Sequence, residues 1–116
     1  MDTLERIREQ VENNPILIYM KGTPQFPQCG FSSRAAAALQ KCGEKFAYVN
    51  VLEDPEIFEH LPKFADWPTF PQIYIDGELV GGCDITLELL ESGELEKMVK
   101  EAAKKWPKEE EAQAES

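Results

Sequence analysis

The sequence lacks several features, and each absence narrows the class of protein. No apolar run approaches the roughly 20 residues that a membrane-spanning helix needs, so we expect no membrane segment. Positive charge is scarce, because 12 Lys and Arg stand against 22 Asp and Glu, for a formal net charge of −10. Nucleic acids and anionic membranes require a basic surface, so neither is an expected partner. The N-terminal sequence MDTLERIREQ is too charged for a signal peptide and too acidic for a transit peptide.

Cysteine and histidine are also few. The three cysteines are irregularly spaced and do not resemble the framework of a disulfide-stapled domain. Free thiols in a reducing compartment are the simplest interpretation, and we expect a cytoplasmic protein. The single histidine, His60, lies far from the thiols and argues against a zinc site. We interpret it as a solvated helix residue.

What is present fits one small α/β domain. A chain of 116 residues can bury one modest core. We assign residues 1–106 to this domain. The sequence KEEEAQAES at the C-terminal end contains no core-forming residue, so we expect residues 107–116 to be a disordered acidic tail.

Helix and strand signals alternate along the domain. Helices are expected over residues 2–13, from about 30 to 42, from Asp54-Pro55 onward, and after Asp84 and Ser92; strands are expected over 16–20, 46–51, 72–75 and 78–80. The helical crossover between the first two strands favours parallel pairing, and Asp76-Gly77 indicates a hairpin between the last two. The order predicts a four-stranded mixed sheet with helices on both faces.

Three local expectations accompany this order. Pro62 should kink or split its helix, because proline removes a backbone donor. Residues 81–84 should form a flexible turn in which Asp84 caps the next helix. Ile85 should contribute to the apolar face of that same helix.

Cys29 is the strongest functional candidate. It ends a proline-broken loop, residues 21–28, and precedes an alanine-rich helix. A thiol at a helix start meets unpaired N–H groups and the positive end of the helix dipole, and both favour the thiolate. The alternative is a buried structural cysteine. The polar, turn-rich loop argues for a surface position instead.

Four motifs in order carry a family resemblance: residues 21–24 (KGTP), 29–32 (CGFS), 67–71 (WPTFP) and 81–84 (GGCD). Together they resemble the monothiol glutaredoxins of the CGFS class, in their short single-domain bacterial form. The resemblance spans about residues 3 to 106 and implies a thioredoxin-like fold. Ser32 stands where dithiol relatives have a second cysteine. Cys29 therefore cannot close a local disulfide, and a mixed disulfide with a small thiol or a bond to metal is expected.

The resemblance also implies a glutathione site. Lys21 would meet a carboxylate of glutathione. The Phe70 backbone would pair with the ligand like an added strand, because Thr69 and Pro71 match a turn whose proline is cis in the family. A solvated lysine and a plain loop are the alternatives for these residues.

Of the remaining residues at this site, some match the family pattern and one departs from it. Cys83 and Asp84 match the family turn that holds the γ-glutamyl end of glutathione, although Asp84 could be only a helix cap. In many relatives an arginine on the third helix contacts the glycine carboxylate, and the matching residue here is Phe58. Lys21 alone, or Lys63 from the next turn, would then serve that carboxylate. We expect weaker glutathione binding than in relatives.

A 2Fe–2S cluster usually needs four thiolates. Cys29 supplies one, and Cys42 lies on the expected core face of its helix. Cys83 could be inert, a resolving partner for Cys29, or only a backbone contributor. The resemblance implies a homodimer that bridges one 2Fe–2S cluster with Cys29 of each subunit and the thiols of two glutathiones. It also implies BolA-like proteins and iron–sulfur acceptor proteins as partners.

Two main functions remain open from the sequence. The first is a carrier that binds and transfers the cluster and serves iron homeostasis. The second is a glutathione-dependent oxidoreductase that reduces mixed disulfides through Cys29. The resemblance favours the carrier, because the loop over residues 21–28 is longer than in dithiol relatives, the second cysteine is missing, and family members of this type usually have weak oxidoreductase activity. A redox sensor that uses Cys29 and Cys83 is a third possibility.

Overall fold

The computed structural model describes residues 2–106, and the predicted tail over 107–116 lies outside the described residues. The elements follow the order α1 (Thr3–Asn13), β1 (Ile16–Met20), α2 (Gly30–Lys41), β2 (Ala47–Asn50), a 3-10 turn (Val51–Glu53), α3 (Pro55–Ala65), β3 (Gln72–Ile75), β4 (Glu78–Gly81), α4 (Cys83–Ser92) and α5 (Glu94–Ala103). Within residues 2–106, no helix is long and apolar enough to cross a membrane.

The four strands form one mixed sheet in the order β2-β1-β3-β4. β1 runs parallel to β2, as the helical crossover predicts, and antiparallel to β3. β3 and β4 form the predicted hairpin, in which Asp76 and Gly77 both have positive φ, 55° and 80°. Two left-handed residues in a two-residue turn match the right-handed twist of the strands. The predicted mixed sheet is confirmed.

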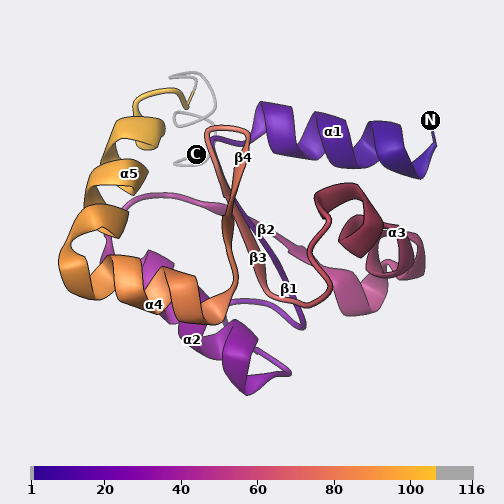
Figure 1. The fold of residues 1–116 in the computed structure, drawn as a ribbon, viewed down its shortest axis with the longest axis horizontal. Helices are drawn as coiled ribbons and strands as arrows, with labels where there is room; N and C mark the ends of the chain where they lie inside the picture. The colour runs from indigo at the N-terminus through magenta and orange to yellow at the C-terminus, as the bar shows by residue number, and fades with distance from the viewer. Residues whose placement is uncertain (1, 107–116) are drawn as a thin grey trace.

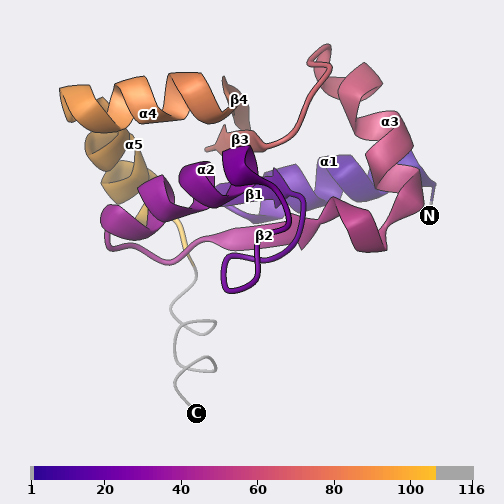
Figure 2. The same ribbon diagram turned by 90° about the horizontal axis from the view of Figure 1, so that it is seen from below.

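Helices cover both faces of this sheet (Figures 1 and 2). On one face, α2, α4 and α5 pack against side chains such as Ile18 and Ile73. On the other face, α1 and α3 pack against Leu17, Tyr19 and Tyr74. Every residue of β1 is buried, because both faces of this central strand are covered. The continuous apolar sequence of β1 follows from this position.

The helix starts follow their sequence signals at α1 and α3. Asp2 Oδ1 accepts a hydrogen bond from the Glu5 N–H at 2.8 Å and caps α1. Asp54 caps α3 through the Ile57 N–H at 3.3 Å, with proline at the first helical position. Asp54 also forms an ion pair with Arg6, which joins the two helices. The hydrogen bond from Arg6 lowers the pKa of the Asp54 carboxyl.

The expected split at Pro62 is wrong, because α3 continues through this residue, which lies half-exposed near the helix end, where water can replace the lost hydrogen bond. Two further local expectations were also wrong. Gly82, not Asp84, is the N-cap of α4, and the helix begins at Cys83, so Asp84 falls in the first turn. Ile85 is 36% exposed and leaves the core side of α4 to other residues, including the fully buried Thr86.

Candidate functional site

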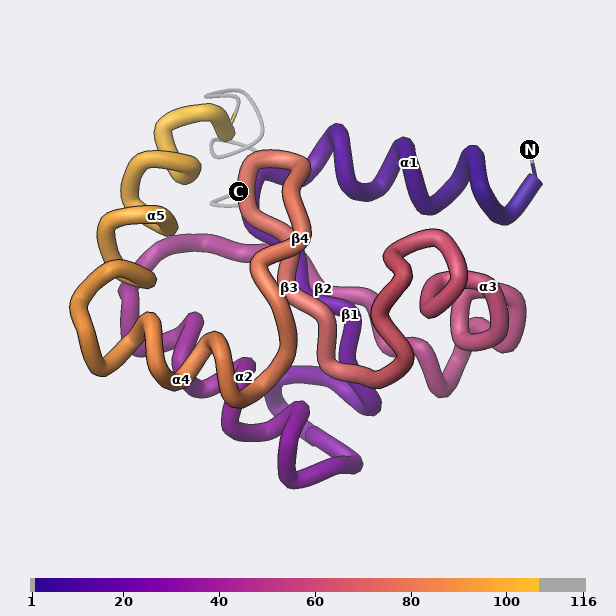
Figure 3. The backbone as a smooth tube through the Cα atoms, in the orientation of Figure 1, coloured from indigo at the N-terminus to yellow at the C-terminus, as the bar shows by residue number. Residues whose placement is uncertain are grey.

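Three chain connections meet at one end of the sheet. β1 and β3 are antiparallel with Tyr19 opposite Gln72, so the end of β1 lies beside the start of β3. β4 is antiparallel to β3 with Gly81 opposite Ile73, which brings the end of β4 to the same edge. Figure 3 shows the β1–α2, α3–β3 and β4–α4 connections gathered there. The sheet register therefore brings together three segments that are distant in sequence.

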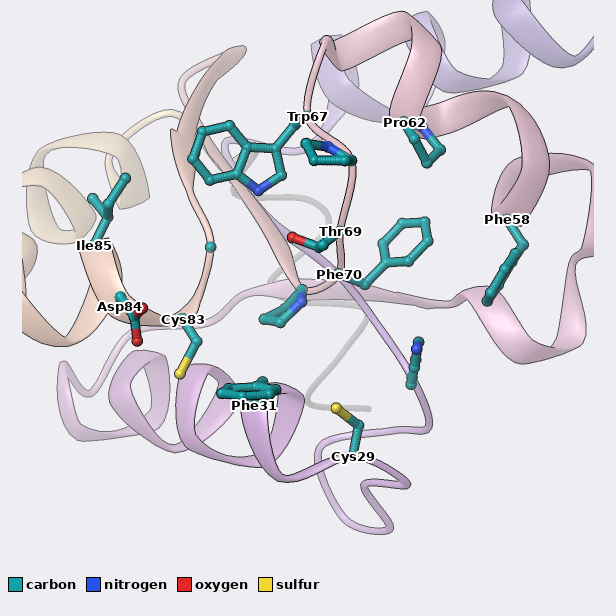
Figure 4. A pocket seen from close by; sticks show the side chains of 14 residues that line it. Cys29, Phe31, Phe58, Pro62, Trp67, Thr69, Phe70, Cys83, Asp84 and Ile85 are labelled. Atoms are coloured by element: carbon teal, nitrogen blue, oxygen red, sulfur yellow. The ribbon is translucent and has the colours of Figure 1, made fainter.

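A pocket of about 660 Å³ lies between these connections. This volume lies within the usual range for small-molecule sites. Seven predicted site residues line it: Lys21, Cys29, Thr69, Phe70, Pro71, Cys83 and Asp84. Figure 4 shows Cys29 and Cys83 on either side of Phe31, with Phe70 facing Phe58. Lys63 is exposed on α3 and is not among the lining residues.

The Cys29 side chain is half-buried at the N-cap of α2 and makes no capping hydrogen bond of its own. The pKa of its thiol is below the ordinary value, chiefly because the backbone N–H of Ser32 favours the charged form of the sulfur. The N–H of Phe31, the Ser32 hydroxyl and the Lys21 ammonium act in the same direction, while partial burial opposes them. The helix start therefore stabilises the thiolate, as the sequence predicts.

Ser32 links this thiol to the end of β1. Its side chain is fully buried, and its Oγ accepts a hydrogen bond from the Lys21 backbone N–H at 3.1 Å. The same hydroxyl group also lowers the pKa of the Cys29 thiol. A hydroxyl has one donor and two acceptor sites, so it can serve both partners at once. Ser32 is therefore a polar bridge in the position of a second cysteine.

We expect Ser32→Ala to raise the pKa of the Cys29 thiol, because a hydroxyl group that favours the charged form is lost. The thiolate then forms at higher pH, and Cys29 reacts more slowly with iodoacetamide below that pH. The variant also leaves the Lys21 N–H without its partner, at a cost of roughly 1–3 kcal/mol. The alkylation rate measured against pH tests this expectation. Ser33→Ala is the matched control, and identical profiles for the two variants would contradict it.

The loop before Cys29 is held by its own backbone. The N–H and C=O of Thr23 pair with the C=O and N–H of Phe26 at 3.3 and 3.1 Å. The Gln28 N–H donates to the Lys21 carbonyl at 2.9 Å, and the Asn50 side chain accepts from the Gly22 N–H at 2.9 Å. This ordered loop presents the Phe26 side chain to solvent at 75% exposure.

The opposite wall of the pocket is residues 67–71. The Phe70–Pro71 peptide bond is cis, as the motif predicts. The Gln72 side-chain amide donates to the carbonyls of Trp67 and Thr69 at 3.1 and 3.3 Å. Gln72 itself is fully buried at the start of β3. The backbone of this wall is thus tied to the sheet through a side chain.

An aromatic pair lies at one end of the pocket. The Phe58 and Phe70 rings have centroids 5.4 Å apart at an interplanar angle of 44°. Lys21 Nζ lies 5.8 Å from the Phe58 ring centroid, within the range of a cation–π interaction. Among the described residues, Lys21 is the one cation that lines the pocket and Asp84 the one carboxylate. The pocket therefore combines an apolar lining with one charge of each sign.

Sequence reasoning missed several lining residues. Phe31 is 54% exposed, and Arg34 lies over its ring at 5.1 Å. A signal for Phe31 existed, because it falls off the core stripe formed by the alanines and Leu39 of α2. Pro62 and Ile85 also line the pocket. Their positions depend on how α3 and α4 pack, which local patterns do not specify.

The other two cysteines lie in protected positions. Cys42 is buried in the core beside α2, and burial raises the pKa of its thiol. Cys83 lines the pocket at only 7% exposure. All three cysteines are free thiols. Within residues 2–106, no three His, Cys, Asp or Glu side chains are grouped to hold a metal ion.

These features define a class of protein: a thioredoxin-like domain with a thiol at a helix start that faces a cis-proline wall. The sequence profile of the glutaredoxin family matches residues 16–80, and the chain belongs to this family. Its relatives include glutaredoxin 4 of Buchnera aphidicola subsp. Acyrthosiphon pisum, which is 59% identical over 106 residues and covers 91% of this chain and 98% of the relative.

Two further comparisons agree with this assignment. Glutaredoxin 4 of Escherichia coli (strain K12) is 57% identical over 108 residues, covering 93% of this chain and 94% of the relative. The solution structure of reduced poplar apo GrxS14 superposes with a TM-score of 0.69 at 44% identity, covering 86% of this chain and 89% of that one. The thioredoxin-like fold expected from the motifs is confirmed.

Proposed function

We propose that this chain is a monothiol glutaredoxin of the CGFS class that binds glutathione and carries a 2Fe–2S cluster shared between two subunits. One observation carries the proposal: a half-exposed cysteine with a lowered thiol pKa opens into a pocket that has one cation and one carboxylate. The neighbouring Ser32 cannot form a disulfide with it. The thiol is therefore available to an external partner.

The charges of the pocket suit glutathione, which has a carboxylate at one end and an α-amino acid at the other, with a thiol between them. Lys21 beside Phe58 suits the glycine carboxylate, and Asp84 suits the ammonium of the γ-glutamyl end. The Phe70 backbone would pair with the middle of the peptide, and the first turn of α4 at Cys83 would offer N–H groups to the γ-glutamyl carboxylate. Thr69 and Pro71 shape the wall beside Phe70.

The thiolate count supports sharing of the cluster between two chains. Four thiolates usually hold a 2Fe–2S cluster. Cys42 and Cys83 are both buried, whereas Cys29 is half-exposed. Two copies of Cys29 and two glutathione thiols would complete the set. Two ligands would then be exchangeable small molecules, which suits release of the cluster to iron–sulfur acceptor proteins or sharing with BolA-like proteins.

Anaerobic purification from iron-supplied cells tests the proposal. Visible absorption, iron and glutathione content, and native mass should identify a coloured dimer with two irons and two glutathiones. Dialysis without glutathione should release the cluster and leave monomers. A colourless monomer in the presence of iron, sulfide and glutathione would overturn the carrier function.

The lowered pKa of the Cys29 thiol favours a second candidate, a glutathione-dependent oxidoreductase. The Cys29 thiolate would attack the glutathione sulfur of a protein–glutathione disulfide, and the protein thiolate would leave. A second glutathione thiolate would then attack the Cys29 mixed disulfide and release glutathione disulfide. Turnover of a glutathionylated peptide by the apo protein, coupled to glutathione reductase, tests this activity.

Phe58 leads to a prediction about affinity. An arginine at this position would add a second cation near Lys21, so Phe58→Arg should tighten glutathione binding about tenfold, as expected for one hydrogen bond to a charged group. Calorimetric titration with glutathione measures the change. Leu4→Arg on exposed α1 is the control for net charge. Equal affinities for Phe58→Arg and the control would remove the role assigned to this position.

A further inference from the structure

Gln72 is a buried polar residue with an unusual set of partners. Its side chain is fully buried at the first position of β3, in a strand otherwise made of Ile and Tyr. Nε2 donates to the Trp67 carbonyl at 3.1 Å and to the Thr69 carbonyl at 3.3 Å, and Oε1 accepts from the Tyr74 hydroxyl at 3.1 Å. Both amide hydrogens are therefore used on one short segment of backbone.

That segment has few other ways to be held. Residues 67–71 form neither helix nor strand, and two of the five are prolines without an N–H. Trp67 is attached to α3 through its own N–H, which donates to the Pro62 carbonyl at 3.0 Å. The Gln72 amide adds the link on the side of the sheet. All five residues line the pocket, so this link acts directly on its wall.

The Gln72 side chain is backed by a set of packed and hydrogen-bonded side chains. Gln72 lies opposite Tyr19 on the neighbouring strand, and the Tyr19 and Tyr74 rings pack edge to face with centroids 5.7 Å apart. Tyr19 in turn donates from its hydroxyl to Gln10 Oε1 at 2.8 Å. An amide fixed by such neighbours holds its two acceptors at defined positions.

We propose that Gln72 is a positioning residue for peptide recognition: by holding the Trp67 and Thr69 carbonyls, it sets the Phe70 backbone against the backbone of the bound peptide. This inference rests on the proposed binding of glutathione. A purely structural role would lower stability without changing the preference of the site for a peptide. The two roles therefore differ in a measurable quantity.

The preference of the site for a peptide can be measured through the equilibrium constant for thiol–disulfide exchange between Cys29 and a small disulfide. The Cys29 thiolate attacks one sulfur of glutathione disulfide, the Cys29–glutathione disulfide forms, and one glutathione thiolate leaves. Hydroxyethyl disulfide reacts in the same way but brings no peptide to the pocket. The ratio of the two constants, corrected for the two leaving thiols, isolates peptide recognition from the reactivity of Cys29.

Two substitutions separate positioning from stability. Gln72→Met keeps the volume and removes both donations, and it should lower the ratio about tenfold, the effect of one or two lost backbone contacts. Tyr74→Phe removes one hydrogen bond from the same network and keeps both donations to the wall. It should lower the thermal midpoint and leave the ratio unchanged. Equal ratios for the two variants would overturn the proposal.

A third variant covers the case in which Gln72→Met does not fold. Gln72→Glu keeps the shape and the acceptor for the Tyr74 hydroxyl, and burial against two carbonyl oxygens favours its protonated form, which can donate to one of them but not to both. Its ratio should fall below the wild-type value, and a ratio equal to the wild type would overturn the proposal. A wild-type ratio near one would instead overturn the proposed glutathione recognition itself, so the two failures are distinguishable.

Discussion

Cys29→Ser should abolish both the mixed disulfide with glutathione and the binding of a shared iron–sulfur cluster. A serine hydroxyl does not ionise at neutral pH, so the backbone N–H groups at the start of α2 would have no anion to stabilise. We do not expect Cys42 or Cys83 to replace it, because both are buried, at 5% and 7% exposure. Intact mass after treatment with glutathione disulfide, and iron content after anaerobic reconstitution, measure the two losses.

Cys42→Ala provides the control for this prediction. Its sulfur lies in the core, where it donates to the Ala38 carbonyl at 3.5 Å, and it does not line the pocket. The control should keep one glutathione per chain and its full cluster content. Cluster retention by Cys29→Ser would contradict the ligand assignment and direct attention to Cys83.

Gly22→Ala should have the largest effect on stability. Gly22 has φ of +95°, and an added Cβ would lie 2.6 Å from the Phe26 carbonyl oxygen and 2.7 Å from the Gln28 nitrogen. Both are backbone atoms of the loop before Cys29, so they cannot rotate away. We expect a loss of about 3 kcal/mol, from left-handed strain of roughly 1–3 kcal/mol and the steric overlap. Urea unfolding measures the loss.

A second readout separates the loop from the whole fold. Displacement of Gln28 would move the adjacent Cys29 away from the start of α2, so its alkylation profile should shift to higher pH. Gly43→Ala is the matched control, since it also has positive φ, +79°, but its added Cβ meets nothing within 4 Å. Gly43→Ala should lower the free energy of unfolding by only about 1 kcal/mol and leave the alkylation profile of Cys29 unchanged. Similar losses of unfolding free energy for the two variants would contradict the prediction. They would show that movement of the loop relieves the steric overlap at Gly22.

Much of the fold was predictable because its signals are local. A capping aspartate, an Asp-Gly turn and a five-residue apolar strand each act through neighbours a few residues apart. The same holds for Cys29, whose thiol is influenced chiefly by the N–H groups of Phe31 and Ser32, two and three residues further along the chain. The local expectations that were wrong concern Pro62, Asp84 and Ile85. The outcome at each residue depends on its surroundings in the folded molecule, such as solvent, a neighbouring backbone or another helix, which a local sequence pattern does not contain.

The residues that line the pocket could be predicted only from the four family motifs of the sequence. These motifs and the order of the elements led to the prediction of seven lining residues. The Phe58–Phe70 pair, the approach of Lys21 to Phe58, and the link from Gln72 to Trp67 and Thr69 are properties of the packed molecule. Local sequence chemistry therefore accounts for the reactive thiol. The register of the antiparallel strands accounts for the wall that faces it, because that register alone brings residues about 40 positions apart to one end of the sheet.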